Sequence, residues 1–585
     1  MKIMNKINYV VSFTCLLGCS ISYATSVAPN GDYNFTTTDD GISIRKAVES
    51  SSDYVELRYQ YAETDSIVMG INSADQSFHF NDGVEGGNAE VEFNVSLSYS
   101  LQSQSTGSVN HFINGTTNST APWALTGEYE VTNNLILMNA SITEDGETKS
   151  ARRLFMSTPN SELILGSEIN KDNSSYNCIG CNNGQDITLL ETETYLGLQI
   201  GLKKRTQQLS LADFTGTYIV NASGLYMKCQ DQDQDGNSLD YSESCQTVSR
   251  TSWIDEMVVI LNGDGSCSTP SIKVGEITTF HFASNYLDNY IFTEGIVDEG
   301  AAISCNYIVS GVDDVIITID DGDSDGPIVA ELKTSSDLRF LVGTKQFDSN
   351  LPSPVTWDFD RGLIWAMKVT ATPALSDLSG TYLGSSSGSG FRDNCITDDG
   401  NPDTCPAERS PIEHFKENFA ITFNGLGECT MKGYFQEVSL LLKEGDYKAA
   451  SIQDKNISYV ATGCSYDLEA QSSIIKITIM DDDSEVSELR ASLSDDGKIL
   501  MFTLFDLNGV SSNLGTVIPT QYFPLVAGSA NEIKGVAIKY DGVITDSTIT
   551  KWLNAKSTKN DFGGDGMADI LLRNSSTGQL FLYEM

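Results

Sequence analysis

The residues with the clearest capacity for chemistry are acidic side chains spaced along a glycine-rich segment near the C-terminus. This segment reads DFGGDGMAD and places carboxylates at Asp561, Asp565 and Asp569. Calcium prefers several hard oxygen ligands, and Gly566 permits the sharp bend that brings such ligands together. We therefore expect Asp561, Asp565 and Asp569 to bind Ca²⁺, with backbone carbonyls or water completing the coordination shell.

A second acidic loop reads DQDQDGNSLD. Asp231, Asp233 and Asp235 stand at positions one, three and five of an EF-hand-like loop, with Gly236 at position six. The twelfth position is Ser242, where an EF-hand loop has glutamate. The pattern fits either a second Ca²⁺ site or a plain acidic loop.

The C-terminal loop and the apolar segment after it resemble the FG-GAP or VCBS-type repeat, over about residues 559–585. In that family the repeat is one blade of an integrin-α-like β-propeller, and its Asp-rich loop holds Ca²⁺ between two strands. The resemblance implies a short blade-like β fragment with structural calcium. Gly563 stands where the family usually has Asn or Asp, which removes one side-chain ligand. The expected affinity is accordingly in the weak extracellular range, roughly 10⁻⁴ to 10⁻³ M.

The first 24 residues have the pattern of an export signal, with a short basic start and an apolar segment too short to span a bilayer. Two processing positions are compatible with this signal. Residues 16–19 resemble the bacterial lipobox, which would leave Cys19 as a lipidated N-terminus, whereas residues 22–24 fit ordinary cleavage after Ala24. No later stretch reaches 18 unbroken apolar residues. We expect an exported protein, either an outer-membrane lipoprotein or a secreted one, whose membrane contact is at most the lipid anchor.

Three related blocks make up most of the chain: residues 25–204, 205–370 and 371–541, followed by a linker and the calcium-binding fragment at 542–585. The second and third blocks open alike, with LADFTGTY and LSDLSGTY. All three close alike, with GLQIGLK, GLIWAMK and GVAIK. Each also contains a tyrosine, a polar turn and a β-branched run, as in CNYIVSGVDDVIITI. Because the repeat is domain-sized, we expect three duplicated domains and not a solenoid.

Cysteine positions predict a disulfide framework, since an even set in an exported chain indicates disulfides. Four cysteines of the second block match four of the third, while the first block has Gly127 where Cys305 and Cys464 stand. Each loop closed by such a bond would contribute on the order of 3 kcal/mol by restricting the unfolded chain. The remaining CxxC is interpreted as a local staple in a long loop, because a redox motif needs a thioredoxin-like setting and a zinc site needs further ligands. The predicted pairs are Cys229–Cys245, Cys267–Cys305, Cys395–Cys405, Cys429–Cys464 and Cys178–Cys181.

The residue pattern within each block indicates β-structure. Apolar and polar residues alternate along 91–100, 55–61 and 419–423, which is the period of half-buried strands. Pairs such as Asn262-Gly263 and Asp496-Gly497 favour tight hairpins. No long stretch has a helical apolar stripe. We predict an all-β protein of three duplicated antiparallel β domains, each a barrel or a sandwich, plus the short blade-like fragment.

Signals for catalysis are weak. The segment GSSSG at 384–388 fits the G-x-S-x-G pattern, but we expect it in a Ser/Gly-rich loop with no helix after it. The four histidines are scattered. Paired carboxylates of a glycoside hydrolase are defined in space, so the 79 acidic residues leave that activity open.

The net charge of −43 disfavours nucleic acid and anionic membranes as partners and favours cations. Together these patterns predict an exported envelope or extracellular protein with a non-catalytic role in binding or adhesion to a protein or polysaccharide, and with Ca²⁺ as a structural ion. Two alternatives remain: a secreted polysaccharide hydrolase, and a barrel protein that holds a small apolar ligand.

Overall fold

The fold was analysed on a computed structural model of the 585-residue chain. The structure describes these residues: 28–48, 55–81, 88–101, 109–122, 124–144, 147–182, 185–229, 247–282, 291–320, 322, 327–346, 358–369, 373–393, 408–443, 451–469, 473–480, 486–508, 528–542, 545–553, 570–573 and 580–583. The described residues are almost entirely antiparallel β-sheet, so the predicted all-β class is confirmed.

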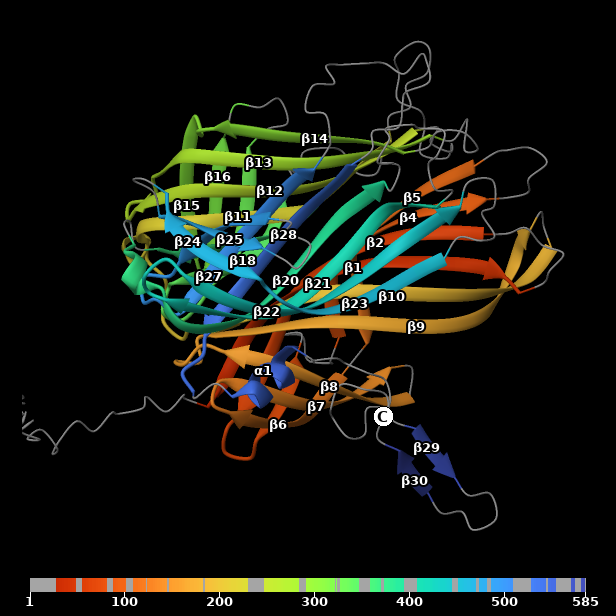
Figure 1. The fold of residues 1–585 in the computed structure, drawn as a ribbon, viewed down its shortest axis with the longest axis horizontal. Coiled ribbons are helices and arrows are strands. Elements are labelled where there is room, and N and C mark those ends of the chain that lie inside the picture. Colours follow the sequence, from red (N-terminus) through yellow and green to blue (C-terminus); the bar gives the residue numbers. More distant parts are fainter. Residues whose placement is uncertain are drawn as a thin grey trace, which may run out of the picture.

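The strands of the first block form one sheet in the order β1-β10-β9-β8-β7-β6-β3-β2-β4-β5. An additional β1–β2 pairing closes β1, β10, β9, β8, β7, β6, β3 and β2 into a barrel, whereas the β4–β5 hairpin extends from β2 as an open sheet. The long strands β1, β2, β9 and β10 take part in both regions (Figure 1). The strands are β1 (Gly31–Ala47), β2 (Val55–Asn72), β3 (Ser77–Asn81), β4 (Asn88–Leu101), β5 (Val109–Pro122), β6 (Ala124–Thr132), β7 (Leu135–Glu144), β8 (Glu147–Ser157), β9 (Leu163–Asn182) and β10 (Gln185–Lys203).

The second and third blocks each form a nine-stranded sheet, and the two sheets have the same strand order. That order is β14-β13-β12-β11-β19-β18-β17-β16-β15 in the second block and β23-β22-β21-β20-β28-β27-β26-β25-β24 in the third. The strands of the second block are β11 (Thr215–Cys229), β12 (Thr247–Asn262), β13 (Cys267–Phe282), β14 (Ile291–Gly300), β15 (Ser304–Ser310), β16 (Asp314–Asp320), β17 (Ile328–Thr334), β18 (Phe340–Gln346) and β19 (Asp358–Lys368). Those of the third are β20 (Ser379–Asp393), β21 (Glu408–Asn424), β22 (Cys429–Lys443), β23 (Ser451–Val460), β24 (Gly463–Leu468), β25 (Ile474–Met480), β26 (Val486–Leu493), β27 (Ile499–Asn508) and β28 (Gly528–Lys539).

Each barrel closes at one junction between two strands, which we call the seam: β3 and β6 in the first block, β13 and β15 in the second, and β22 and β24 in the third. The contacts at this seam differ among the blocks. In the first block β3 pairs with β6, with Phe78 opposite Gly127. In the second and third blocks the equivalent strands meet at a single isolated bridge beside a disulfide, Cys267–Cys305 or Cys429–Cys464. A covalent bond thus stands where the first block has ladder pairing, and Gly127 has the register position of the seam cysteines.

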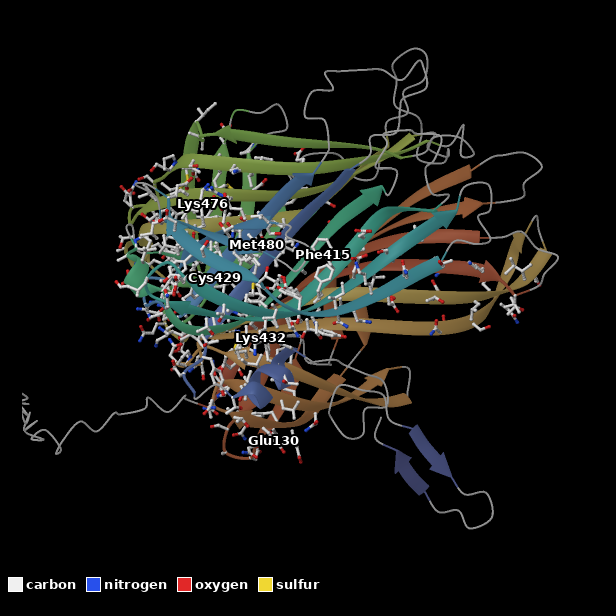
Figure 2. All side chains as sticks on the ribbon, viewed as in Figure 1. Glu130, Phe415, Cys429, Lys432, Lys476 and Met480 are labelled. Atoms are coloured by element: carbon white, nitrogen blue, oxygen red, sulfur yellow. A yellow bond between two sulfur atoms is a disulfide. The ribbon has the colours of Figure 1, made fainter. Side chains whose placement is uncertain are left out.

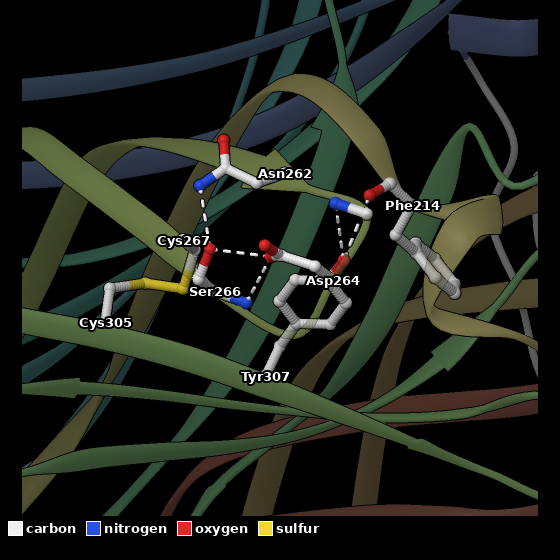
Figure 3. Close-up of a disulfide and its surroundings, with 8 residues drawn as sticks. Phe214, Asn262, Asp264, Ser266, Cys267, Cys305 and Tyr307 are labelled. Carbon is white, nitrogen blue, oxygen red and sulfur yellow. Dashed lines mark hydrogen bonds between the residues drawn. A yellow bond between two sulfur atoms is a disulfide. The ribbon is translucent and has the colours of Figure 1, made fainter.

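A tyrosine from each repeated hairpin supports this seam. In the second block the Tyr307 hydroxyl donates to the carbonyl of Phe214 and accepts from the Gly263 amide (Figure 3). It also donates to the carbonyl of Leu211. Tyr466 of the third block makes the corresponding contacts with the carbonyls of Leu375 and Leu378, and Tyr129 of the first with that of Pro29. In the second and third blocks the accepting residues belong to, or directly follow, the short 3₁₀ turns η1 (Leu211–Asp213) and η2 (Leu375–Asp377).

The opening motifs of the blocks have an equally repeated role. Tyr33, Tyr218 and Tyr382 are buried, and their hydroxyls donate to the carbonyls of Ser161, Leu338 and Gly497. Each acceptor is the left-handed residue of the hairpin that precedes β9, β18 or β27. The conformation is uncommon for non-glycine residues, so the tyrosines help to hold turns that Ser161 and Leu338 adopt at some cost.

The three barrels share a hydrophobic core that lies between them. The closing strands β10, β19 and β28 supply much of it. On β19 and β28 the opposite face also carries apolar residues, which fill the strand's own barrel. On β10 that face carries Gln199 and Gly201 instead, and Gly201 lies against the Phe35 ring. Members of the shared core are Leu198, Ile200 and Leu202; Leu363, Trp365 and Met367; and Met501, Val536 and Ile538.

Helix α1 (Asp546–Leu553) completes this shared core through Trp552, which is 1% exposed. Its indole N–H donates to the carbonyl of Gly384 at 3.0 Å, and its own carbonyl accepts from Asn418. The linker interpretation of residues 542–585 did not include a helix. Two turns are too short to give a periodic sequence signal, and the helix forms because its apolar side packs into the core that the blocks share.

Polar contacts also join the blocks. The Ser336 hydroxyl donates to the Glu162 carboxylate between the first and second blocks, and Arg339 pairs with Asp495 at 2.8 Å between the second and third. Asn133 donates to the Tyr540 hydroxyl at 2.6 Å between the first and third. The three β domains are therefore packed as one body.

The expectation of a loop at 384–388 was wrong, since this segment lies inside β20. A Cβ at Gly384 would lie 2.2 Å from the Phe419 ring, so glycine is required for packing. Ser385 is buried and donates to Asn418 at 3.0 Å. Sequence alone suggests a loop here because Ser and Gly rarely dominate a central strand.

The described strands end with a short hairpin, β29 (Ile570–Arg573) and β30 (Leu580–Tyr583). It follows the Asp-rich loop of the tail directly. Among helices within the described ranges, none has the length and apolarity that a membrane span requires.

Candidate functional site

The residues predicted to bind calcium lie outside the described residues. This holds for Asp561, Asp565 and Asp569 of the tail and for Asp231, Asp233 and Asp235 of the second block, as it does for Cys19. Within the described ranges, no group of three or more His, Cys, Asp and Glu side chains is arranged to hold a metal ion. The two calcium sites therefore stay predictions.

Of the predicted disulfides, Cys267–Cys305 and Cys429–Cys464 are present. Cys245, Cys395 and Cys405 lie outside the described residues, and the side chain of Cys229, at the end of β11, is not among those described. Cys178 and Cys181 lie in strand β9, where we expected a long loop, and their side chains are likewise outside the description.

A titratable cluster that sequence reasoning missed lies inside the third barrel. The Glu417 carboxylate on β21 accepts hydrogen bonds from the Tyr459 hydroxyl on β23 and from the Ser386 hydroxyl on β20, the latter at 3.3 Å. A stacked ring pair, Phe415 and Phe435, lies beside it with ring centroids 5.6 Å apart. The cluster thus joins three strands that are not all sequence neighbours.

Gly433 makes this contact possible. It pairs with Tyr459 in the ladder, and a Cβ there would lie 2.3 Å from the Tyr459 ring and 2.5 Å from the Glu417 carboxylate. The ring crosses β22 through this gap to reach β21. In the second block the equivalent pair is Ile272 opposite Gly300, so large and small residues are exchanged between the two strands. The one sequence signal was an isolated glycine inside a strand, which marks a close approach.

Burial raises the pKa of Glu417 to about 7, and the hydrogen bonds from Tyr459 and Ser386 oppose this effect. Burial and the nearby Glu417 carboxylate also raise the pKa of Tyr459. A carboxyl group that exchanges its proton near neutral pH is a recurrent feature of functional sites. Here the hydrogen bond from Tyr459 to Glu417 also attaches the outer strand β23 to the barrel.

Replacing Glu417 by Gln should change the pH dependence of stability. A carboxyl whose folded pKa is raised stabilises the fold fully below about pH 4.5, and this contribution is lost as pH rises toward 7. The free energy of unfolding of the native protein should therefore fall relative to Glu417→Gln by about 2 kcal/mol across this interval. This figure is smaller than the free energy that corresponds to the full pKa shift, because the Glu417 side chain is half-buried and water screens part of the effect. Urea unfolding at a series of pH values measures the difference.

Glu488→Gln is the matched control, because Glu488 is exposed and paired with Lys476 at 2.9 Å. Its pH profile should run parallel to that of the native protein. Parallel profiles for Glu417→Gln as well would show that the Glu417 carboxyl has an ordinary pKa.

An exposed apolar patch lies on the outside of the third barrel. Val460, Met480 and Val486 are 57%, 40% and 56% exposed, so all three present their side chains to solvent. Met480 pairs with Val486, and the Met480 carbonyl accepts from the Thr462 amide at 2.9 Å, two residues after Val460. Lys476 of the same strand is labelled with Met480 in Figure 2. This rim patch is the candidate contact surface of the molecule.

Comparison with known proteins identifies no family. No family model matches the chain, and no curated protein matches it. Among solved structures, the chain is similar to one described as "The Structure of Intact Ap-TbpB (N and C lobes)", at 9% sequence identity and a TM-score of 0.21. The match covers 87% of this chain and 78% of that chain. A TM-score of this size does not establish a common fold.

Proposed function

We propose that this chain is an exported, non-catalytic binding protein that recognises a macromolecular ligand, a protein or a polysaccharide, at its outer surface. The observation that carries the proposal is the way the barrels are filled. In the second barrel the inward side chains form a continuous buried cluster that includes Tyr218, Val259, Ile317, Leu341 and Ile364. Packed interiors favour recognition on the outside over carriage of an apolar ligand within.

The disulfides support the exported location. Cys267–Cys305 and Cys429–Cys464 form the barrel seams, and such structural disulfides persist in oxidising compartments. The shared core supports a binding role, since it fixes three barrels as one scaffold on which surface groups keep their positions. The rim patch of Val460, Met480 and Val486 is an apolar surface on that scaffold, the kind of feature that marks contact sites.

The test is solid-phase binding of the purified protein to a defined panel: collagen, fibronectin, mucin, chitin and alginate. We expect retention on at least one of these, and its loss in the Val460→Glu/Met480→Glu variant, because a charge at the centre of an apolar contact is costly. Lys476→Ala, at the border of the patch, is the control and should bind normally.

Two outcomes would count against the proposal. Reducing ends released from chitin or alginate would show a hydrolase, and equal retention of the double variant would show that the rim patch is not the contact surface. The absence of retention on every member of the panel would refute recognition of these ligand classes.

Calcium binding by the tail is part of the same proposal. Three carboxylates at Asp561, Asp565 and Asp569 repel one another without a cation, so Ca²⁺ should stabilise the tail by mass action at millimolar concentrations. Asp565→Ala should abolish this response while the melting of the three β domains stays unchanged. Calorimetric titration with CaCl₂ measures the heat directly, and a melting curve unaffected by EGTA would contradict the prediction.

A further inference from the structure

A buried donor and a buried acceptor face each other across two strands of the second block. Trp365 of β19 is the ladder partner of Asn221 of β11, so both side chains lie on one face of the sheet, with Cβ atoms roughly 5 Å apart. Trp365 is 1% exposed and Asn221 is 3% exposed. Among the described residues, neither the indole N–H nor the amide oxygen has a hydrogen-bond partner. Burying such groups is costly unless something else binds them.

Apolar residues of the shared core flank this pair. On β19, Leu363 and Met367 lie two positions on either side of Trp365 and therefore on the same face. On β11, Ile219 lies two positions before Asn221. All three flanking residues belong to the core between the barrels. The indole N–H and the amide oxygen are thus polar groups at the edge of an apolar contact between blocks.

The other ladder neighbour of Asn221 is Glu256 of β12, whose carboxylate is engaged elsewhere. It accepts from Arg490 of β26 at 2.9 Å and from Thr503 of β27 at 3.3 Å. Both donors belong to the third block, so the second block packs against the third at this point. The side chain beside Asn221 is therefore used to join the blocks.

The third block shows how the same position is satisfied by protein alone. Ser385 of β20, like Asn221 of β11, follows the buried tyrosine of its opening motif by three residues. The Ser385 hydroxyl donates to its ladder partner Asn418 at 3.0 Å. In the second block the corresponding ladder partner is Glu256, which is bonded to the third block. The unpartnered state of Asn221 follows from this difference.

A third polar group lies next to the pair. Ser223 is two residues after Asn221 on the same face of β11, and it is 3% exposed. Its ladder partners, Leu363 and Ile254, are apolar. In the described part of the chain the Ser223 hydroxyl also has no hydrogen-bond partner.

The chemistry of these groups defines what they can bind. The indole N–H only donates, the amide oxygen only accepts, and the hydroxyl does both. A cation would meet the indole N–H and an anion would meet the amide oxygen, so an ion of either sign finds one group of the wrong polarity. A small neutral molecule that both donates and accepts matches all three groups.

We propose that one water molecule binds here as a fixed part of the fold. It accepts from the Trp365 indole and donates to the Asn221 amide oxygen, with the Ser223 hydroxyl as its third partner. Buried waters typically make two to four such hydrogen bonds, and one water spans the gap between opposed ladder positions. Because the neighbouring Glu256 is bonded to the third block, this water is enclosed where the two blocks pack.

The test is water-contact NMR on the full-length protein, deuterated and labelled with ¹⁵N at tryptophan. We expect a cross-peak between the Trp365 indole proton and the water resonance, with opposite signs in laboratory-frame and rotating-frame spectra, as for a water that tumbles with the protein. Trp365→Phe identifies the signal by its loss. Trp552 is the internal control: it is equally buried, but its indole N–H donates to the Gly384 carbonyl at 3.0 Å, so its cross-peak should be absent.

Two variants separate the bound water from other sources of the signal. Ser223→Ala should keep the cross-peak, although it removes a hydroxyl proton that exchanges with water. Asn221→Leu should lose it, because the acceptor is gone and the larger apolar side chain occupies its space. The native and Ser223→Ala spectra decide the matter even where Asn221→Leu does not fold.

Four results would overturn the proposal. Absence of the Trp365 cross-peak in the native protein would mean that the indole bonds directly to a protein acceptor. Its loss in Ser223→Ala would assign the signal to the hydroxyl proton, and its retention in a folded Asn221→Leu would exclude Asn221 as a ligand of the water. An equal cross-peak at Trp552 would show that water reaches both indoles without a specific site.

Discussion

Trp552→Ala should lower the free energy of unfolding by about 4 kcal/mol, which is the usual cost of emptying the site of a buried tryptophan. The indole is 1% exposed, lies in the core shared by the three blocks and donates to the Gly384 carbonyl. Its removal leaves a cavity in the shared core and deletes the hydrogen bond from the indole to that carbonyl. We expect a lower melting temperature and easier proteolysis of helix α1.

Thr550→Ala on the same helix is the control, because Thr550 is exposed. It should change stability by no more than about 0.5 kcal/mol. If Trp552→Ala and Thr550→Ala melt alike, helix α1 is not part of the folded body.

The double variant Cys267→Ser/Cys305→Ser should lose about 4 kcal/mol, since the bond closes a loop between residues 38 apart in sequence. Among the described residues, the other contacts at this seam are one isolated ladder bridge, Ser266 to Asn306, and the hydrogen bonds of the Tyr307 hydroxyl. Guanidinium unfolding of the variant and of the native protein measures the loss.

The first block provides an internal comparison, because Phe78 and Gly127 occupy the same seam without a disulfide. A reducing agent should therefore destabilise the second and third blocks while leaving the closure of the first unaffected. Native-state hydrogen exchange resolves the blocks separately. Equal protection of the β13 and β15 amides with and without the disulfide would contradict the predicted role of the bond.

The repeated residues of the chain carry most of the information about the block architecture. Matching Cys305, Cys464 and Gly127 in the sequence predicts that one residue of each seam has the same register, and the ladder has Gly127 in that position. Tyrosines at the ends of the opening motifs likewise occupy one structural position three times. Duplication makes such inferences reliable because equivalent residues face equivalent neighbours.

Local sequence was less informative where a residue's role depends on a distant partner. The contact of Glu417 with Tyr459 requires the gap at Gly433 on the strand between them, and no spacing along the chain encodes it. The serines of 384–388 suggested a loop because their partners, such as Asn418, belong to another strand.

By itself, the sequence determined the β class, the threefold duplication and the seam disulfides. Alternation of apolar and polar residues can be seen along a single strand, and repeated motifs and matched cysteines can be seen by comparing one block with another. Only the tertiary structure decided that the three barrels share one core. The closing motif GLIWAMK is apolar on both faces, so the sequence indicates that both faces of this strand are buried. It does not indicate which part of the protein covers the outer face, which lies in the shared core. The packing neighbours of Trp365 and Trp552 come from blocks or segments far away in sequence, and tertiary packing alone brings them together.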